Sequence, residues 1–280
     1  MKHIMAILIS VFSLGYHGKT IDFERYSPCH RTTVAHFLNK GKWDDTRLED
    51  ILKSTVIQII YQEALRSGKP VFCIVDDTIS SKIKPSSRAL HPIEDAYFHQ
   101  SHLKRKQDYG HQAVAVMLSC NGIVLNYALV MYDKGMSKVK IVQEIAKELP
   151  IPPVVSYFLC DRWYTCGDIM DAFISTDASL STEEILDKYA DRWPVELFFR
   201  QSKDKLSFDR YQIRSSKGIR RYWLLMSLAH LIACTGCGET MPFEDGYAFI
   251  HNQIQKERLH FIYQCGARNI LFDDVLALVA

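Results

Sequence analysis

The chain has 280 residues, of which 48% are hydrophobic, and its formal net charge at pH 7 is +2. A chain of this length and composition buries a sizeable core, which excludes an intrinsically disordered protein and a small disulfide-stabilised one. The small net charge also excludes attraction to nucleic acid through overall charge, so any such attraction has to come from local clusters of Lys and Arg.

Residues 1–68 have the pattern of a helical N-terminal region. The opening "KHIMAILISVFSL" imitates a signal peptide, but no cleavage site of small residues follows and the apolar run is too short to span a membrane. We interpret it as a buried helix; a targeting segment or a membrane anchor at residues 4–14 is the alternative. The segments "TTVAHFLNK" and "DTRLEDILKSTVIQIIYQEALRSG" follow with helical spacing of apolar residues.

Residues 69–232 change to alternating strands and helices. We predict strands in "VFCIVDDT", on both sides of Asn121 and Gly122, in "VVSYFLCD" and in "FIST", with helices at "SKVKIVQEIAKEL" and around Glu196. Three antiparallel strands followed by a strand that is reached through a helical crossover are typical of an α/β fold, a ribonuclease-H-like mixed sheet flanked by helices. Residues 233–280 are predicted to form a helical C-terminal region.

Acidic residues end two of these strands. Asp76 and Asp161 each close a predicted strand, and Glu196 lies on the long helix that follows. Three converging carboxylates repel one another unless a cation joins them, and their oxygen atoms favour Mg²⁺ or Mn²⁺, with two ions expected. The alternative is that the aspartates only form turns and that Glu196 is solvated.

The segment "YADRWPVELFFRQSK" places charges in an aromatic-rich helix. Helical spacing puts Tyr189, Arg192, Glu196 and Lys203 on one polar stripe, which we expect to face a site. Pro194 should bend this helix between Arg192 and Glu196. Ser181 and Glu184 are expected to form a capping box at its start.

The same residues resemble a known family. "YADRWPVELFFRQSK" fits the Y-R-E-K signature of DDE transposases of the insertion-sequence-four type, and its aromatic filler is similar to the insertion-sequence-seven-hundred-one group. "VDDT", "LCDRWYT", "KRKQDYGHQAVAVML" and "YQIRSSKGIRRYWLLMSLAHLI" resemble neighbouring family segments. The resemblance implies that Asp76, Asp161 and Glu196 bind the metal ions, and that Tyr189, Arg192 and Lys203 contact DNA near the reacting phosphate.

The first metal ligand remains a choice between two neighbouring aspartates. The family pattern places it two residues before a Thr or Ser, which favours Asp76, because Thr78 follows at that distance. Strand alternation then places Asp77 on the opposite face.

Basic clusters suggest a track for a DNA backbone. One cluster comprises Lys104, Arg105 and Lys106, and a second follows Lys203, at Lys205, Arg210, Arg214, Lys217, Arg220 and Arg221. Solubilising surface charge is the alternative.

A zinc site at His230, Cys234 and Cys237 is disfavoured because no second pair of ligands follows at the required spacing. Buried thiols are the preferred interpretation, with the Trp223 stripe as core.

One departure from the family concerns the interval before the glutamate. Family members usually carry a long β insertion there, whereas residues 162–195 here leave only thirty-four residues between Asp161 and Glu196. We therefore expect a DNA transposase, and an internal truncation of this copy is one interpretation of the short interval. The alternatives are a catalytically inactive DNA-binding remnant and a general ribonuclease-H-like nuclease.

The expected partner is DNA, at the terminal inverted repeats and at the target, and we expect a homodimer to bind it. The expected location is the cytoplasm, at the nucleoid when bound to DNA, and no membrane is involved.

Overall fold

The computed structural model describes residues 2–13, 15–27, 29–90, 92–101, 104–161, 164, 182–236 and 238–279. The chain forms two compact units. A helical unit comprises Met1–Lys42, Asp204–Ile213 and Lys217–Ala280, and a sheet unit comprises Trp43–Lys203 and Arg214–Ser216. The division into regions at residues 68 and 232 stays a prediction, although the helix before the first strand lies in the sheet unit.

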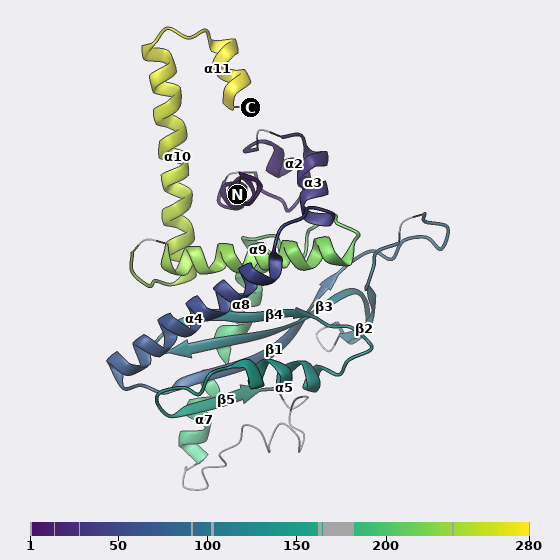
Figure 1. The fold of residues 1–280 in the computed structure, drawn as a ribbon, viewed down its shortest axis with the longest axis vertical. Helices are drawn as coiled ribbons and strands as arrows, with labels where there is room; N and C mark the ends of the chain where they lie inside the picture. Colours follow the sequence, from purple (N-terminus) through teal and green to yellow (C-terminus); the bar gives the residue numbers. More distant parts are fainter. Residues whose placement is uncertain are drawn as a thin grey trace. The chain divides into compact units, whose positions relative to one another are not determined.

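The sheet unit is built on five strands in a mixed sheet (Figure 1). They are β1 (Val71–Ser81), β2 (Tyr97–Ser101), β3 (Lys106–Cys120), β4 (Ile123–Met131) and β5 (Ser156–Cys160). β1 lies between an antiparallel β3 and a parallel β5, and β4 and β2 pair with different parts of β3. This arrangement confirms the predicted mixed sheet flanked by helices and agrees with a ribonuclease-H-like fold; only β2 was not expected.

The β3–β4 hairpin forms where the turn dipeptide predicts it. Asn121 and Gly122 both have positive φ angles, 48° and 83°, which Asn and Gly adopt more readily than other residues. The two strands pair from Cys120 and Ile123 outwards. The turn chemistry therefore fixes the register next to the turn, and an irregularity between Val116 and Met117 shifts it further along the strands.

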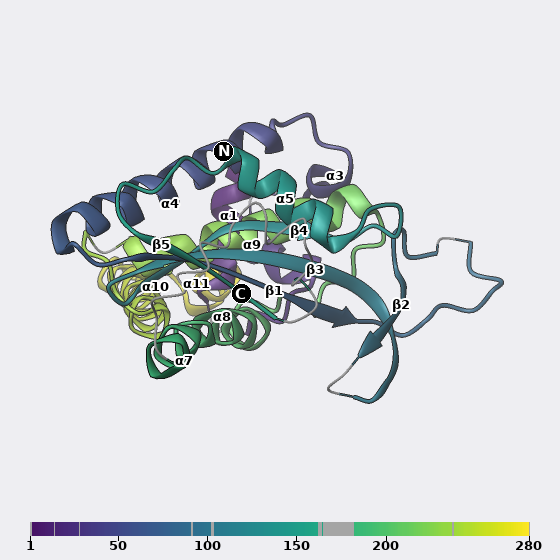
Figure 2. The same ribbon diagram turned by 90° about the horizontal axis from the view of Figure 1, so that it is seen from below.

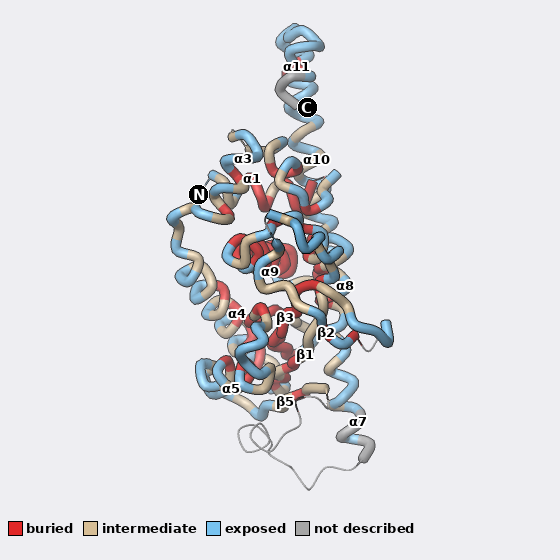
Figure 3. The backbone as a smooth tube through the Cα atoms, turned by 90° about the vertical axis from the view of Figure 1, so that its right-hand side faces the viewer, coloured by how far each residue is buried: buried red, intermediate tan, exposed pale blue. Residues whose placement is uncertain are grey.

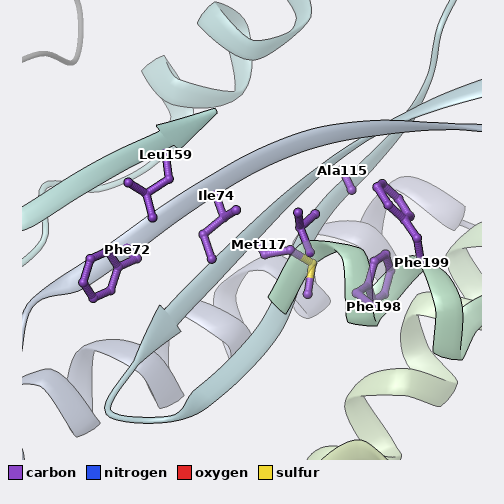
Figure 4. Packing of buried hydrophobic residues seen from close by; sticks show 8 residues of the cluster. Phe72, Ile74, Ala115, Met117, Leu159, Phe198 and Phe199 are labelled. Carbon is purple, nitrogen blue, oxygen red and sulfur yellow. The ribbon is translucent and has the colours of Figure 1, made fainter. Parts of the chain in front are cut away.

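Helices cover both faces of this sheet (Figure 2). α4 (Asp45–Ser67) and α5 (Lys138–Glu148) lie on one face, and α8 (Trp193–Asp204) lies on the other. Figure 4 shows the α8 side, where Phe198 and Phe199 pack with Phe72 and Ile74. Because strand side chains alternate, the face that presents Phe72 and Ile74 to α8 also presents Asp76.

The predicted long helix is in fact two helices, which corrects the expectation of one bent helix. α7 (Thr182–Ala190) ends before a turn at residues 191–192, and α8 begins at Trp193. Pro194 is thus the second residue of α8, where a missing N–H costs nothing because first-turn amides have no intrahelical acceptor. Tyr189 and Arg192 therefore precede α8 instead of sharing a continuous helix with Glu196.

The helical unit is described by itself. It contains α1 (Lys2–Val11), α2 (Thr20–Glu24), α3 (Arg31–Asn39), most of α9 (Ser216–Thr235), α10 (Phe243–Ala267) and α11 (Phe272–Val279). α9 is the most deeply buried of these helices (Figure 3), and Trp223 stacks on Phe208 at 4.8 Å, so the prediction of a core stripe is confirmed. α1 buries Ile7 and Val11, which confirms its prediction as a buried helix.

Within the described ranges no helix is both long enough and apolar enough to cross a membrane. Three predictions, the "FIST" strand at residues 173–176, the Ser181 cap and the thiol of Cys237, lie outside the described residues.

Candidate active site

Asp76 lies in the middle of β1, and Asp161 is the residue that follows β5. The prediction that Asp76 closes its strand was wrong, because β1 continues to Ser81 by pairing with β3. The β1–β5 register runs from Val71 opposite Ser156 to Val75 opposite Cys160, and each aspartate is the next residue. Residues at matching positions on paired parallel strands have side chains on the same face of the sheet. Asp76 thus follows the last paired position of β1 and β5, and strand alternation turns Asp77 to the opposite face, which favours Asp76 over Asp77 as the first acid.

Arg192 joins the first acid to the glutamate. Its Nη1 donates to Oδ2 of Asp76 over 2.9 Å, and its Nη2 donates to Oε1 of Glu196 over 3.0 Å. The Asp76 side chain is 19% exposed and that of Arg192 15% exposed, so this ion pair is largely shielded from water. The guanidinium also lies 5.7 Å from the ring centre of Tyr189. Three of the four signature residues thus gather beside Asp76, in the middle of β1.

Lys203, the fourth signature residue, reaches the same strand. Its Nζ donates to Oγ1 of Thr78 over 2.7 Å. Thr78 follows Asp76 by two residues, so both side chains leave β1 on the face that α8 covers. The hydroxyl of Thr78 therefore holds the ammonium group of Lys203 on the face of β1 that also presents Asp76.

Asp77 belongs to a different network on the other face. It accepts hydrogen bonds from Lys138 over 2.8 Å and from the hydroxyl of buried Tyr164 over 2.9 Å, and it also accepts from Gln112. The Tyr164 amide donates to the carbonyl of Asp161 over 2.9 Å. Asp77 consequently ties α5 and β3 to the segment that carries Asp161, a structural role that the sequence pattern did not reveal.

The environment of Asp76 shifts its ionisation. Burial raises the pKa of Asp76, and the hydrogen bond from the Asp77 amide and the charge of Arg192 offset this only in part. For Arg192, burial acts to lower the pKa, but the carboxylate of Asp76 and further neighbours outweigh it and raise the pKa. Burial and the adjacent Asp77 raise the pKa of Tyr164, which keeps this hydroxyl a donor.

The donor chemistry suits a hard divalent cation, yet the acids are not collected around one point. Over the described ranges, no three His, Cys, Asp or Glu side chains are grouped so that they could hold a metal ion. The physical reason is visible at Arg192, whose guanidinium stands between Asp76 and Glu196. A cation that used both carboxylates would take the place of this guanidinium.

The predicted basic residues have different surroundings. Lys104, Arg105 and Lys106 are exposed at the turn between β2 and β3, but Lys104 is engaged by Asp108 at 2.6 Å. Arg221 is 2% exposed and donates to the carbonyl oxygens of Phe37, Leu38 and Gly41 at the end of α3. Its place in the predicted DNA track was wrong, because it is buried as a helix cap.

The histidine and the described thiol of the disfavoured zinc site are core residues. The rings of His230 and Phe243 stack with their centres 4.8 Å apart, and the Cys234 thiol lies 3.8 Å from Nδ1 of His230. Burial lowers the pKa of His230 to about 3 and raises that of Cys234 to about 12, so both groups are neutral near pH 7. These contacts favour the buried-thiol interpretation.

Comparison with known proteins adds one match. A family model described as a transposase DDE domain matches residues 173–232. This segment includes Tyr189, Arg192, Glu196 and Lys203 but neither aspartate, and it supports a DDE transposase. No curated protein and no solved structure matches the chain.

Proposed function

We propose that this protein is a DNA transposase of the insertion-sequence-four type, closest to the insertion-sequence-seven-hundred-one group. It hydrolyses a phosphodiester bond at a transposon end and then joins the freed 3′-hydroxyl to target DNA. The observation that carries this proposal is Arg192, which binds an acid of β1 and an acid of α8 at the same time. The family match, which includes both Arg192 and Glu196, supports the transposase class.

Asp76, Asp161 and Glu196 would hold Mg²⁺ or Mn²⁺, with two ions expected for this reaction class. When bound, such ions activate the attacking oxygen and stabilise the charge of the leaving oxygen. The carboxylates act as ligands in this scheme and not as proton donors. Their supply of hard oxygen atoms fits these metals better than zinc.

The neighbouring cations position the DNA. Arg192, once released from the two carboxylates, can offer its planar fork to a phosphate. Lys203 donates to the hydroxyl of Thr78 on the same face of β1 as Asp76, and its ammonium group supplies a second positive charge for a phosphate oxygen. Tyr189 lies beside Arg192 and extends this contact surface. These groups offset the repulsion between carboxylates and phosphates that would otherwise keep DNA away.

The proposal includes DNA ends and target DNA as partners, a homodimer on DNA and a cytoplasmic, nucleoid-bound protein. A second candidate is a catalytically inactive DNA-binding remnant. The short interval of residues 162–195 favours it, since the resembling family carries an insertion there.

A cleavage assay separates these candidates. The full chain is incubated with labelled duplexes from the DNA that flanks its coding region, with Mg²⁺ or Mn²⁺. We expect nicking at a fixed position that Asp76→Asn or Glu196→Gln abolishes, while Asp50→Asn on the exposed side of α4 leaves it intact. Binding without nicking would support the remnant, and equal cleavage of unrelated duplexes would support a general nuclease.

A further inference from the structure

A basic arm follows β1, which ends at Ser81, five residues beyond Asp76. We define the arm as residues 82–90, 92–101 and 104–110, and Figures 1 and 2 show it projecting beyond the paired strands of the sheet unit. β3 belongs both to the central sheet and to the arm, because its residue Gly110 pairs with Ser81 of β1 and with Tyr97 of β2. The arm is therefore a continuation of the central strands and not a separate flap.

Cations dominate the outer parts of the arm. Lys84 and Arg88 are exposed on the loop after β1, and Arg105 and Lys106 are exposed at the β2–β3 turn. Among the described residues none of these four cations forms an ion pair. Such a group of exposed cations has the chemistry of a phosphate-binding surface.

The acids of the arm already have hydrogen-bond partners. Glu94 accepts from the amide of Ser216 over 2.8 Å, and the hydroxyl of Ser216 donates to Asp95, so both acids are held at the base of the arm. Asp108 accepts from Lys104 over 2.6 Å and from the hydroxyl of Ser81. Lys104 therefore braces the turn against β1, which gives it a different role from its neighbours.

Arg105, at the turn between β2 and β3, has an uncommon backbone conformation. Its φ is 50°, in the left-handed region that glycine adopts most easily. An arginine at this position leaves a long cation at the tip of the arm. The aromatic pair Phe98 and Tyr109, with ring centres 5.3 Å apart, and Lys84, 5.2 Å from the Phe98 ring centre, link the two outer parts of the arm.

The distance from the acids fits a duplex. Asp76 and Ser81 are five residues apart on β1, which corresponds to about 16 Å along an extended strand, or about five base pairs of DNA. We propose that the arm binds the phosphate backbone of duplex DNA to one side of the reacting phosphate, an inference that rests on the proposed function. Lys84, Arg88, Arg105 and Lys106 make the contacts, and Lys104 holds the arm in shape.

Salt dependence of binding tests this surface. Affinity of the full chain for a labelled duplex of about three helical turns is measured at several salt concentrations. Each lost phosphate contact reduces the slope of log affinity against log salt by about 0.9, so Arg88→Ala/Lys106→Ala should reduce it by about 2. The matched pair Arg47→Ala/Lys147→Ala, on the exposed sides of α4 and α5, should leave it unchanged.

The charge-conserving pair Arg88→Lys/Lys106→Arg should retain the wild-type slope and guards against loss through misfolding. If the alanine pair keeps the wild-type slope, or if the matched pair Arg47→Ala/Lys147→Ala reduces the slope equally, then the arm does not bind DNA. Neither result would contradict the proposed transposase function. Failure of the wild-type chain to bind any duplex would overturn both.

Discussion

The guanidinium of Arg192 binds the carboxylate of Asp76 over 2.9 Å, across a sequence separation of 116 residues. A second hydrogen bond of 3.0 Å leads from the same guanidinium to Glu196. Arg192 thus supplies positive charge between two acids that a divalent cation would otherwise join. On the proposed function, metal binding and the release of Arg192 towards a phosphate are one linked event.

Replacing Arg192 should separate its two roles. In Arg192→Ala the metal no longer has to displace an ion pair worth about 1 kcal/mol, so Mn²⁺ should bind the metal-free chain about fivefold more tightly. DNA cleavage should nevertheless fall, because a phosphate contact is lost. Calorimetric titration with Mn²⁺ measures the first effect. Weaker Mn²⁺ binding in Arg192→Ala would show that the arginine does not compete with the metal, and Arg192→Lys serves as the charge-retaining control.

The Asp77 network should matter for stability. Tyr164→Phe removes one buried hydrogen bond and should lower the free energy of unfolding by about 1 kcal/mol. Asp77→Asn should cost more, about 2 kcal/mol, because the ammonium of Lys138 then loses its carboxylate. Urea unfolding measures both changes. Equal stability of Asp77→Asn and the wild type would remove this network from the account.

Two glycines of the sheet unit should respond differently to alanine. A Cβ on Gly110 would lie 2.1 Å from the carbonyl oxygen of Ser80, so β1 and β3 would have to move apart. We expect Gly110→Ala to lower the free energy of unfolding by about 3 kcal/mol. Gly122→Ala, with open space around its Cβ but a positive φ, should cost about 1 kcal/mol. Thermal unfolding of the pair checks this order, and the reverse order would contradict the close approach of the strands.

His230 should make stability depend on pH. Burial lowers its folded-state pKa to about 3, below the unfolded value of about 6.5, so the unfolded chain binds the additional proton first. The contribution to stability is complete above pH 6.5 and falls by about 1.4 kcal/mol per pH unit as the pH decreases from there towards 3. His230→Gln should lose this slope. Urea unfolding at pH 6 and pH 5 tests it, and an unchanged slope in the variant would mean that another group causes it.

Local patterns predicted much of the fold and part of the candidate site. The apolar runs before Asp76 and Asp161 gave β1 and β5, and the Asn121–Gly122 turn gave the hairpin, because these signals lie within a few residues. The end of β1 was predicted too early, because its continuation to Ser81 depends on pairing with β3. β2 was missed because "YFHQS" leaves Phe98 exposed and buries His99, which reverses the usual pattern. Pro194 was read as a bend because propensity does not tell whether a proline bends one helix or starts another.

Long-range partners were beyond any local pattern. The surface role expected for Arg221 failed because its acceptors lie 180 residues or more away, at the end of α3. The partners of Asp77 come from β3, α5 and the segment after β5, and only the folded sheet brings them together.

Binding of Mn²⁺ to the full chain tests the shared acid site most directly. Calorimetry should detect binding in the wild type, and Asp76→Asn, Asp161→Asn and Glu196→Gln should each weaken it about tenfold or more, whereas Asp50→Asn should not. If the wild type binds no Mn²⁺, or if loss of the Asp76 carboxylate leaves the affinity unchanged, then Asp76, Asp161 and Glu196 do not share a metal site.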